Sequence, residues 1–183
     1  MNKGKRFAIL LKLSSELLGH GSWCGETHIQ KAVFLLQQVL SVDVESQFIL
    51  YKHGPFSFDL RDSITEMIAN GLLEEVIRRS DYGPTLMATK ESAGFLERFP
   101  KTTAKYSPQI EFITDWIRDK NVGELERLTT AAFLIENLKN IDYEEMANEL
   151  VRVKPHISMQ DARAAIGDAQ LLIKTAQQHK YVG

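Results

Sequence analysis

The chain has very little cysteine. Cys24 is the single cysteine among 183 residues, so an intramolecular disulfide is excluded, and without a pair of cysteines two residues apart there is no cysteine-built zinc site. His20, Cys24 and His28 are spaced four apart and would share one face of a continuous helix. The glycines between them interrupt such a helix, and a glycine-rich loop with an incidental thiol is favoured over a metal site. We therefore predict no metal, no cofactor and a reducing, cytoplasmic location.

Long apolar runs are also missing. A membrane-spanning helix needs about 20 apolar residues, and no stretch approaches that length. The run 7–11 lies behind three basic residues as in a signal peptide, but Lys12 and Glu16 interrupt it and no cleavage site of small residues follows. We expect a first helix of a cytoplasmic protein and no membrane partner.

Neither sign of charge dominates. The chain has 22 Lys and Arg against 24 Asp and Glu, a formal net charge of −2. The two halves, 1–100 and 101–183, are equally balanced, so neither has the strongly basic composition of a nucleic-acid-binding module. Any contact with DNA would need a local patch.

The sequence contains none of the common catalytic motifs. There is no G-x-S-x-G, no phosphate-binding G-x-x-x-x-G-K-[ST], no H-E-x-x-H and no G-x-G-x-x-G after a strand. We predict that the chain is not an enzyme. The alternative is an unrecognised enzyme with a pocket near Lys31, Tyr51 and His53. There the lysine could lower the pKa of the neighbouring histidine, which would act as a base.

The periodicity of the first hundred residues predicts helices, a short strand and a hairpin. Apolar residues at helical spacing predict a helix from about residue 7 to 18, and a second that Thr27 opens with a capping box. Residues 47–52 alternate as a strand with both faces at least partly covered. Two further strands, 72–79 and 85–88, predict a hairpin that would form a wing, followed by a helix from Thr89.

The segment 51–60 (YKHGPFSFDL) predicts a joint between the strand and a third helix. Gly54 permits positive φ, Pro55 fixes its own φ near −65°, and Ser57 can cap the following helix. Gly71 is placed to end that helix.

Residues 100–108 lose periodicity and predict a linker or domain seam. Beyond it every segment reads as helical, and the last helix begins near Ser158. Its Ala- and Ile-rich seam predicts internal packing, with a homodimer interface as the alternative. The fold class that we predict is mainly α with a small β component (α+β): a winged-helix-like domain over 1–100 and a C-terminal helical bundle over 101–183.

Four segments carry a resemblance to known families. Residues 28–36 (HIQKAVFLL), 51–57 (YKHGPFS) and 71–73 (GLL), together with 154–158 (KPHIS), resemble a prokaryotic family typified by YwgA-like proteins. The helix with Gln30 and Lys31 and the Tyr-Gly-Pro joint also resemble, less extensively, the Panacea or SocA-type antitoxin-like domain, which implies binding to a toxin or adaptor protein. Neither family implies a catalytic residue.

The run 71–74, the turn at Gly83, residues 86–89 and Gly94 resemble the end of helix 3, the wing and the next helix of bacterial winged-helix regulators. However, 16 residues with a strand (41–56) separate the second and third helices, whereas a helix-turn-helix uses a turn of about 3 or 4. The third helix also offers Asp59, Asp62 and Glu66 against Arg61, which disfavours a phosphate backbone.

We therefore predict a non-catalytic regulatory or antitoxin-like module that binds a protein partner. Trp23 is either an anchor for that partner or folded back onto the first or second helix, which is favoured. The expected partner-binding residues are Trp23, Lys31, Tyr51, His53, Phe56, Asp59 and Arg61. The alternative is a winged-helix DNA-binding transcriptional regulator, whose contacts would be Lys3, Lys5, Arg6, Asn70, Arg78 and Arg79.

Overall fold

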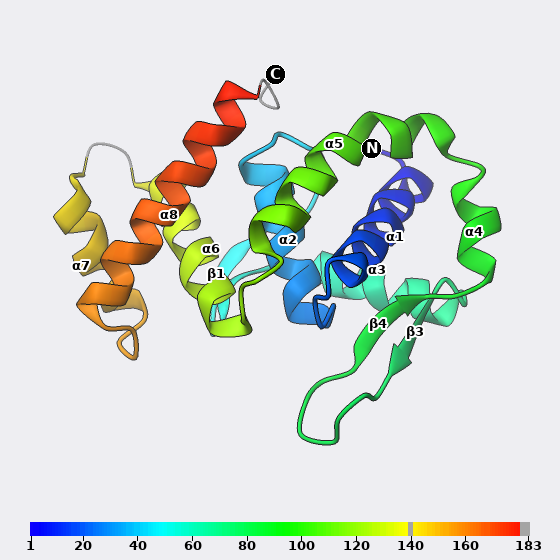
Figure 1. Ribbon diagram of the computed structural model, residues 1–183, viewed down its shortest axis with the longest axis horizontal. Helices are drawn as coiled ribbons and strands as arrows, with labels where there is room; N and C mark the ends of the chain where they lie inside the picture. Colours follow the sequence, from blue (N-terminus) through cyan, green and yellow to red (C-terminus); the bar gives the residue numbers. More distant parts are fainter. Residues whose placement is uncertain (139–140, 180–183) are drawn as a thin grey trace.

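The computed structural model describes residues 1–138 and 141–179, and this part of the chain is mainly helical (Figure 1). Its elements are, in chain order, α1 (Lys3–Gly19), α2 (Glu26–Gln38), β1 (Ile49–Tyr51), β2 (Gly54–Phe56), α3 (Phe58–Ala69), β3 (Leu73–Val76), β4 (Thr85–Ala88), α4 (Glu91–Leu96), α5 (Pro100–Ile117), α6 (Val122–Asn137), α7 (Tyr143–Val153) and α8 (Met159–Gln178). No helix in these described ranges is both long enough and apolar enough to cross a bilayer.

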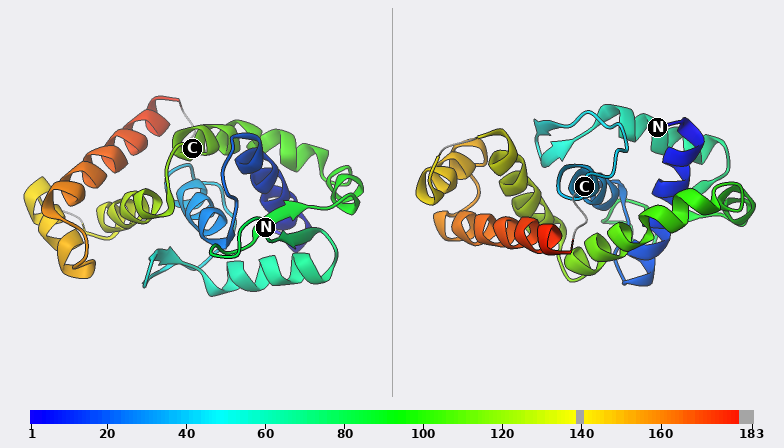
Figure 2. Two further views of the ribbon diagram at one scale, coloured as in Figure 1. Left: turned by 60° about the horizontal axis from the view of Figure 1, so that its bottom comes forward. Right: turned by 90° about the horizontal axis from the view of Figure 1, so that it is seen from above.

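Helices α1 and α2 form the centre of the N-terminal part. Apolar residues surround α1 on several sides, and α2 is buried along nearly its whole length. Helix α5 packs on both of them, α3 lies against α2 and β3, and α4 contacts α1 (Figure 2). So broad an apolar surface on α2 requires neighbours on most sides, as its sequence predicts.

The C-terminal part is built on α6, which packs against α7 and α8 and also against α2 and β2. The small residues of α8 face inward: Ala162, Ala165, Ala169 and Ala176 are buried with Ile166. Small side chains let helices approach closely. This seam therefore packs inside the protein, as predicted.

The predicted linker at 100–108 is wrong. These residues form the first half of α5, which begins with Pro100 in its first turn and continues through Pro108. Proline suits the first helical turn because its missing N–H has no intrahelical partner there. The helix was not predicted because residues 100–108 are mostly polar. Only the side of α5 that packs on α1 and α2 needs apolar residues. The division into 1–100 and 101–183 stays a prediction, although α5 packs against helices of the first segment.

The joint forms a second strand, which the sequence analysis did not predict. β1 and β2 pair antiparallel with Tyr51 opposite Gly54, so Lys52 and His53 make a two-residue hairpin loop. Gly54 has φ +85°, in agreement with its predicted positive φ. Ile49 and Tyr51 are 49% and 53% exposed, so their face of the first strand is partly covered, as expected, but not buried.

The predicted capping box at Thr27 is also wrong. Helix α2 begins one residue earlier, its N-cap is Gly25, and no side chain caps it within the described residues. Cys24, immediately before this cap, has φ +51°. The chain therefore turns sharply into the helix through its backbone, and Thr27 lies inside the first turn.

Both ends of α3 agree with prediction. The Ser57 hydroxyl accepts a hydrogen bond from the Leu60 N–H at 3.2 Å. At the other end the Gly71 N–H donates to Ile68 O and the Leu72 N–H to Met67 O, at 2.9 and 2.8 Å. With Gly71 at φ +68°, these bonds form a Schellman cap, and Leu72 is buried behind it.

Candidate protein-interaction site

The β1–β2 hairpin is fastened to the protein by a buried lysine. Lys31, on α2, is only 2% exposed, and its ammonium donates to Pro55 O at 2.8 Å. Burial lowers the pKa of Lys31 to about 8, partly offset by the nearby carboxylate of Glu126. Lys31 thus lies inside the protein, where it positions the hairpin and does not reach the surface as a partner contact.

Gly54 permits the close approach of the hairpin to α6. A Cβ at this position would lie 3.0 Å from Thr130 Oγ1 and 3.4 Å from both Glu126 O and Lys31 Nζ. Any other residue would therefore push the hairpin away from α6, besides being strained at positive φ.

A second buried lysine holds the other side of the hairpin. Lys154, at the end of α7, donates to Tyr51 O at 2.9 Å and also to Lys52 O. Its ammonium lies 3.1 Å from Glu126 Oε1 in an ion pair between two buried side chains. The segments 51–57 and 154–158, which the sequence analysis singled out separately, are therefore in contact.

Two exposed histidines flank the same carboxylate. His53 Nδ1 lies 3.4 Å from Glu126 Oε2, and His156 Nε2 lies 3.7 Å from Glu126 Oε1. Glu126 thus receives two histidines and a lysine from two segments that are far apart in the sequence, the hairpin and residues 154–158. This cluster supports the hairpin from behind.

The hairpin and the first turn of α3 together carry an aromatic patch, which consists of Tyr51 and Phe56 from the hairpin and Phe58 and Arg61 from α3. Tyr51 is 53% exposed and Phe58 44%. The three ring centroids lie 5.1 to 5.8 Å from one another. The guanidinium carbon of Arg61 lies 5.2 Å from the Phe58 centroid and 5.9 Å from that of Phe56, within range of a cation–π contact.

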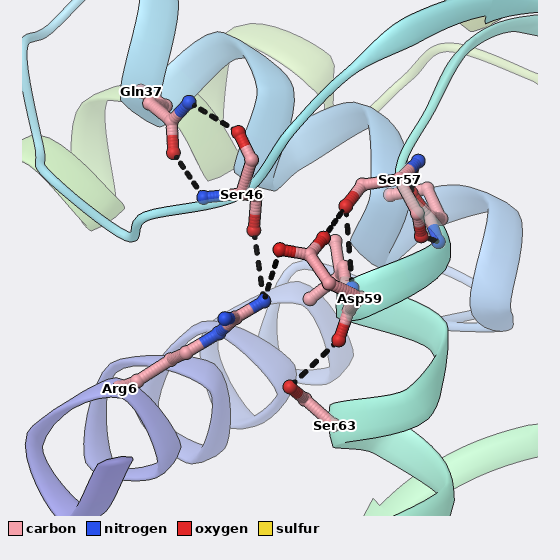
Figure 3. A network of polar contacts seen from close by, with 8 residues as sticks. Arg6, Gln37, Ser46, Ser57, Asp59 and Ser63 are labelled. Atoms are coloured by element: carbon pink, nitrogen blue, oxygen red, sulfur yellow. Dashed lines mark hydrogen bonds and ion pairs between the residues drawn. The ribbon is translucent and has the colours of Figure 1, made fainter. Parts of the chain in front are cut away.

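A polar network fixes the beginning of α3 (Figure 3). Arg6 lies 3.6 Å from the Asp59 carboxylate and donates to Ser46 Oγ at 3.0 Å. Asp59 accepts a hydrogen bond from the Ser57 hydroxyl, and Ser46 is held in turn by the side-chain amide of Gln37. Asp59 and Arg6, predicted for different partners, are therefore engaged with each other.

Trp23 packs on the β3–β4 loop, not on the first or second helix as predicted. Its indole N–H donates to Gly83 O at 2.7 Å, and its ring meets the edge of Tyr82 with centroids 4.9 Å apart. The ring remains partly exposed. It therefore contributes to a surface that the tryptophan, the loop and the start of α2 share.

The residues predicted for DNA binding do not form one patch. The amino end of the chain and the β3–β4 loop lie at opposite sides of the molecule in Figure 1, which separates Lys3, Lys5 and Arg6 from Arg78 and Arg79. Several of these charges also have partners. Lys3 pairs with Glu66, Arg79 forms a bidentate ion pair with Asp81, and Arg78 lies 3.8 Å from Met87 Sδ. Asn70 is the C-cap of α3.

Cys24, in the loop between α1 and α2, has a buried thiol. Cys24 is fully buried, its sulfur lies 3.6 Å from Ser14 Oγ, and burial raises the pKa of the thiol to about 11. Within residues 1–138 and 141–179 no group of three or more His, Cys, Asp or Glu is arranged to hold a metal ion.

The pocket considered for catalysis is small. Lys31, Tyr51 and His53 line a cavity of about 140 Å³ beside Gly54 and the start of α2. The Lys31 ammonium is committed to Pro55 O, and His53 is directed to Glu126. Both side chains therefore support the hairpin.

Sequence reasoning missed Phe58, Glu126 and Lys154. Phe58 directly follows the helix cap and is two residues from Phe56. This spacing is a signal for a shared face, but the segment was interpreted only as a joint between a strand and a helix. Glu126 and Lys154 lie far from the hairpin in sequence. Lys154 continues the apolar spacing of Met146 and Leu150, which is a local signal, but Glu126 lies off the apolar stripe of its helix and has none.

Comparisons with protein-family models, with curated proteins and with solved structures find no match to this chain.

Proposed function

We propose that this chain is a regulatory or antitoxin-like module, without catalytic activity, that binds a protein partner through the aromatic patch. The observation that carries the proposal is a cluster of three aromatic rings, two of them exposed, with an arginine over two of the three. Aromatic residues and arginine are enriched at the centres of protein interfaces and dominate their energetics.

The support behind the patch favours this function. Lys31, Lys154 and Gly54 fasten the hairpin to three helices, so the rings are presented on a fixed backbone. A preorganised surface loses less conformational entropy when it binds. The element order α1, α2, α3, β3, β4 is compatible with a winged-helix-like N-terminal domain, in which the hairpin between α2 and α3 would be an added binding element.

The test is affinity capture with a matched pair of variants. The tagged chain would be used to capture partners from an extract of its own host at low and high salt, after nuclease treatment. Tyr51→Ala combined with Phe58→Ala should reduce capture of a stoichiometric protein about thirtyfold, the effect of about 2 kcal/mol expected at interface hot spots. Mass spectrometry and titration of the purified partner give the readout.

Ile77→Ala is the control, because Ile77 is 77% exposed but lies outside the patch. This variant should bind as the unmodified chain does. Equal binding by the patch variant and the control contradicts the proposal. Recovery of nucleic acid that disappears at high salt, without a protein, would instead favour the DNA-binding alternative.

A further inference from the structure

A cavity of about 340 Å³ lies next to the aromatic patch, between the start of α2, one face of α3 and the β3–β4 hairpin. Its polar and aromatic lining residues are Trp23, Glu26, Thr27, His28, Arg61, Thr65, Glu75 and Tyr82. Arg61 belongs to both the cavity and the patch, so the two form one continuous surface. The apolar part of the wall comes from Ile64, Ile68, Pro84, Leu86 and Val122.

Two buried polar atoms in this lining have no hydrogen-bond partner within the part of the chain that the structure describes. They are Nδ1 of His28 and Oε1 of Glu26, and His28 is only 7% exposed. Burial lowers the pKa of His28, so at neutral pH its ring is uncharged and one ring nitrogen can accept a hydrogen bond. Glu26 Oε1 is thus an acceptor that lacks a donor, and Nδ1 of His28 is a second one in the tautomer whose proton is on Nε2. A buried acceptor without a donor is costly unless a ligand supplies one.

The charges of the lining also favour a donor with positive charge. Glu26 and Glu75 contribute two carboxylates, against which Arg61 is the single basic side chain of the lining besides the uncharged His28. The guanidinium of Arg61 is held over Phe58 and Phe56. The guanidinium of Arg61 therefore lies on the side of the patch. Glu26 has no ion-pair partner among the described residues.

We infer that the cavity receives an arginine side chain of the protein partner. A guanidinium has five donors and no acceptor, so it can satisfy Glu26 and His28 together. Its planar face suits the aromatic rings of Trp23 and Tyr82, and its methylene groups suit the apolar wall. This inference rests on the proposed function, because it names the chemistry with which the partner extends from the patch into the cavity.

The test uses the isolated chain and a pair of small probes. N-acetyl-arginine amide carries the guanidinium, and N-acetyl-citrulline amide has nearly the same shape without the charge. Binding is followed in ¹⁵N-labelled protein by the indole N–H signal of Trp23 and the backbone amides of Glu26 to His28, with Trp116→Phe used to assign the indole signals. We expect saturable shifts with the arginine probe and at least about tenfold weaker binding of the citrulline probe, the effect of losing one charge-assisted hydrogen bond.

Glu26→Gln should weaken binding of the arginine probe about tenfold. Glu74→Gln is the matched control, because Glu74 lies beside Glu75 on β3 but outside the cavity lining, and it should bind as the unmodified chain does. Equal binding of the two probes, or an unchanged affinity in Glu26→Gln, overturns the inference. The probe comparison needs no variant, so it decides the question even if Glu26→Gln does not fold.

The two proposals fail in different ways. If the arginine probe does not bind but capture of a protein depends on Tyr51 and Phe58, the patch stands and the cavity has no such role. If the probe binds as expected but no protein depends on the patch, the proposed function fails and the cavity keeps its selectivity for a guanidinium.

Discussion

Lys31 holds a charged group away from water at the base of the hairpin. Removing an ammonium from solvent disfavours its charged form, and the Glu126 carboxylate offsets only part of that cost. Its bond to Pro55 O does not require the charge, because a neutral amine can also donate. The stability of the hairpin should therefore depend on pH in a window that this one residue sets.

The pKa of Lys31 is about 8 in the folded chain against an ordinary 10.5. Between these values the unfolded chain binds more protons than the folded chain, so the free energy of unfolding rises with pH there and the contribution is flat below about pH 8. The rise amounts to at most about 3 kcal/mol. The measurement is urea unfolding of the unmodified chain and of Lys31→Met, each at about pH 7 and about pH 10. Because all other groups titrate in both chains, the difference between the two chains isolates the contribution of Lys31. A stability difference between the two chains that does not change with pH would contradict this prediction.

At the scale of elements, glycines decide how helices end and hairpins dock. Gly71 at φ +68° closes the cap of α3, and an added Cβ there would meet no neighbour within 4 Å. Gly94 lies within α4, has no positive φ, and is equally free of neighbours. Substitutions at these two glycines therefore differ in the backbone conformation that they require and not in packing.

Gly71→Ala should destabilise the chain by about 1 kcal/mol, because alanine is strained in the left-handed region. Gly94→Ala should stabilise it by about 0.5 to 1 kcal/mol, because alanine restricts the unfolded chain and favours the helix. Denaturant unfolding of both variants measures the difference. The same sign of change in both would mean that the cap of α3 does not control stability.

At the scale of the whole molecule, Glu126 and Lys154 connect the hairpin to the C-terminal helices. Both side chains are buried, and the Lys154 ammonium bridges Glu126 and two hairpin carbonyls. Breaking one partner of a buried ion pair leaves the other charge uncompensated, which costs more than replacing both.

We expect Glu126→Gln and Lys154→Met each to cost about 2 to 3 kcal/mol of unfolding free energy. The double variant should cost at least about 1 kcal/mol less than the sum of the two. Glu111→Gln, at an exposed position on α5, is the control and should change stability by less than about 0.5 kcal/mol. Additive effects of the two buried substitutions would show that the pair does not couple the hairpin to α6 and α7.

Local patterns were sufficient for most of the elements. Apolar periodicity predicted α1, α3, α6, α7 and α8, and the cap residues Ser57 and Gly71 predicted both ends of α3, because these signals act within one helical turn. The same reasoning failed at 100–108, where a helix needs apolar residues on one side only, and at β2, which depends on pairing with β1.

The sequence by itself determined the helical class, the ends of α3 and the positive φ of Gly54, since each follows from the covalent structure of a few neighbouring residues. The tertiary structure alone decided that Lys31 is buried and that Lys154 and Glu126 lie behind the hairpin. It also decided that Tyr51, Phe56, Phe58 and Arg61 form one exposed patch. Those facts depend on which distant segments meet, and that is a property of the packed core, which no local pattern encodes.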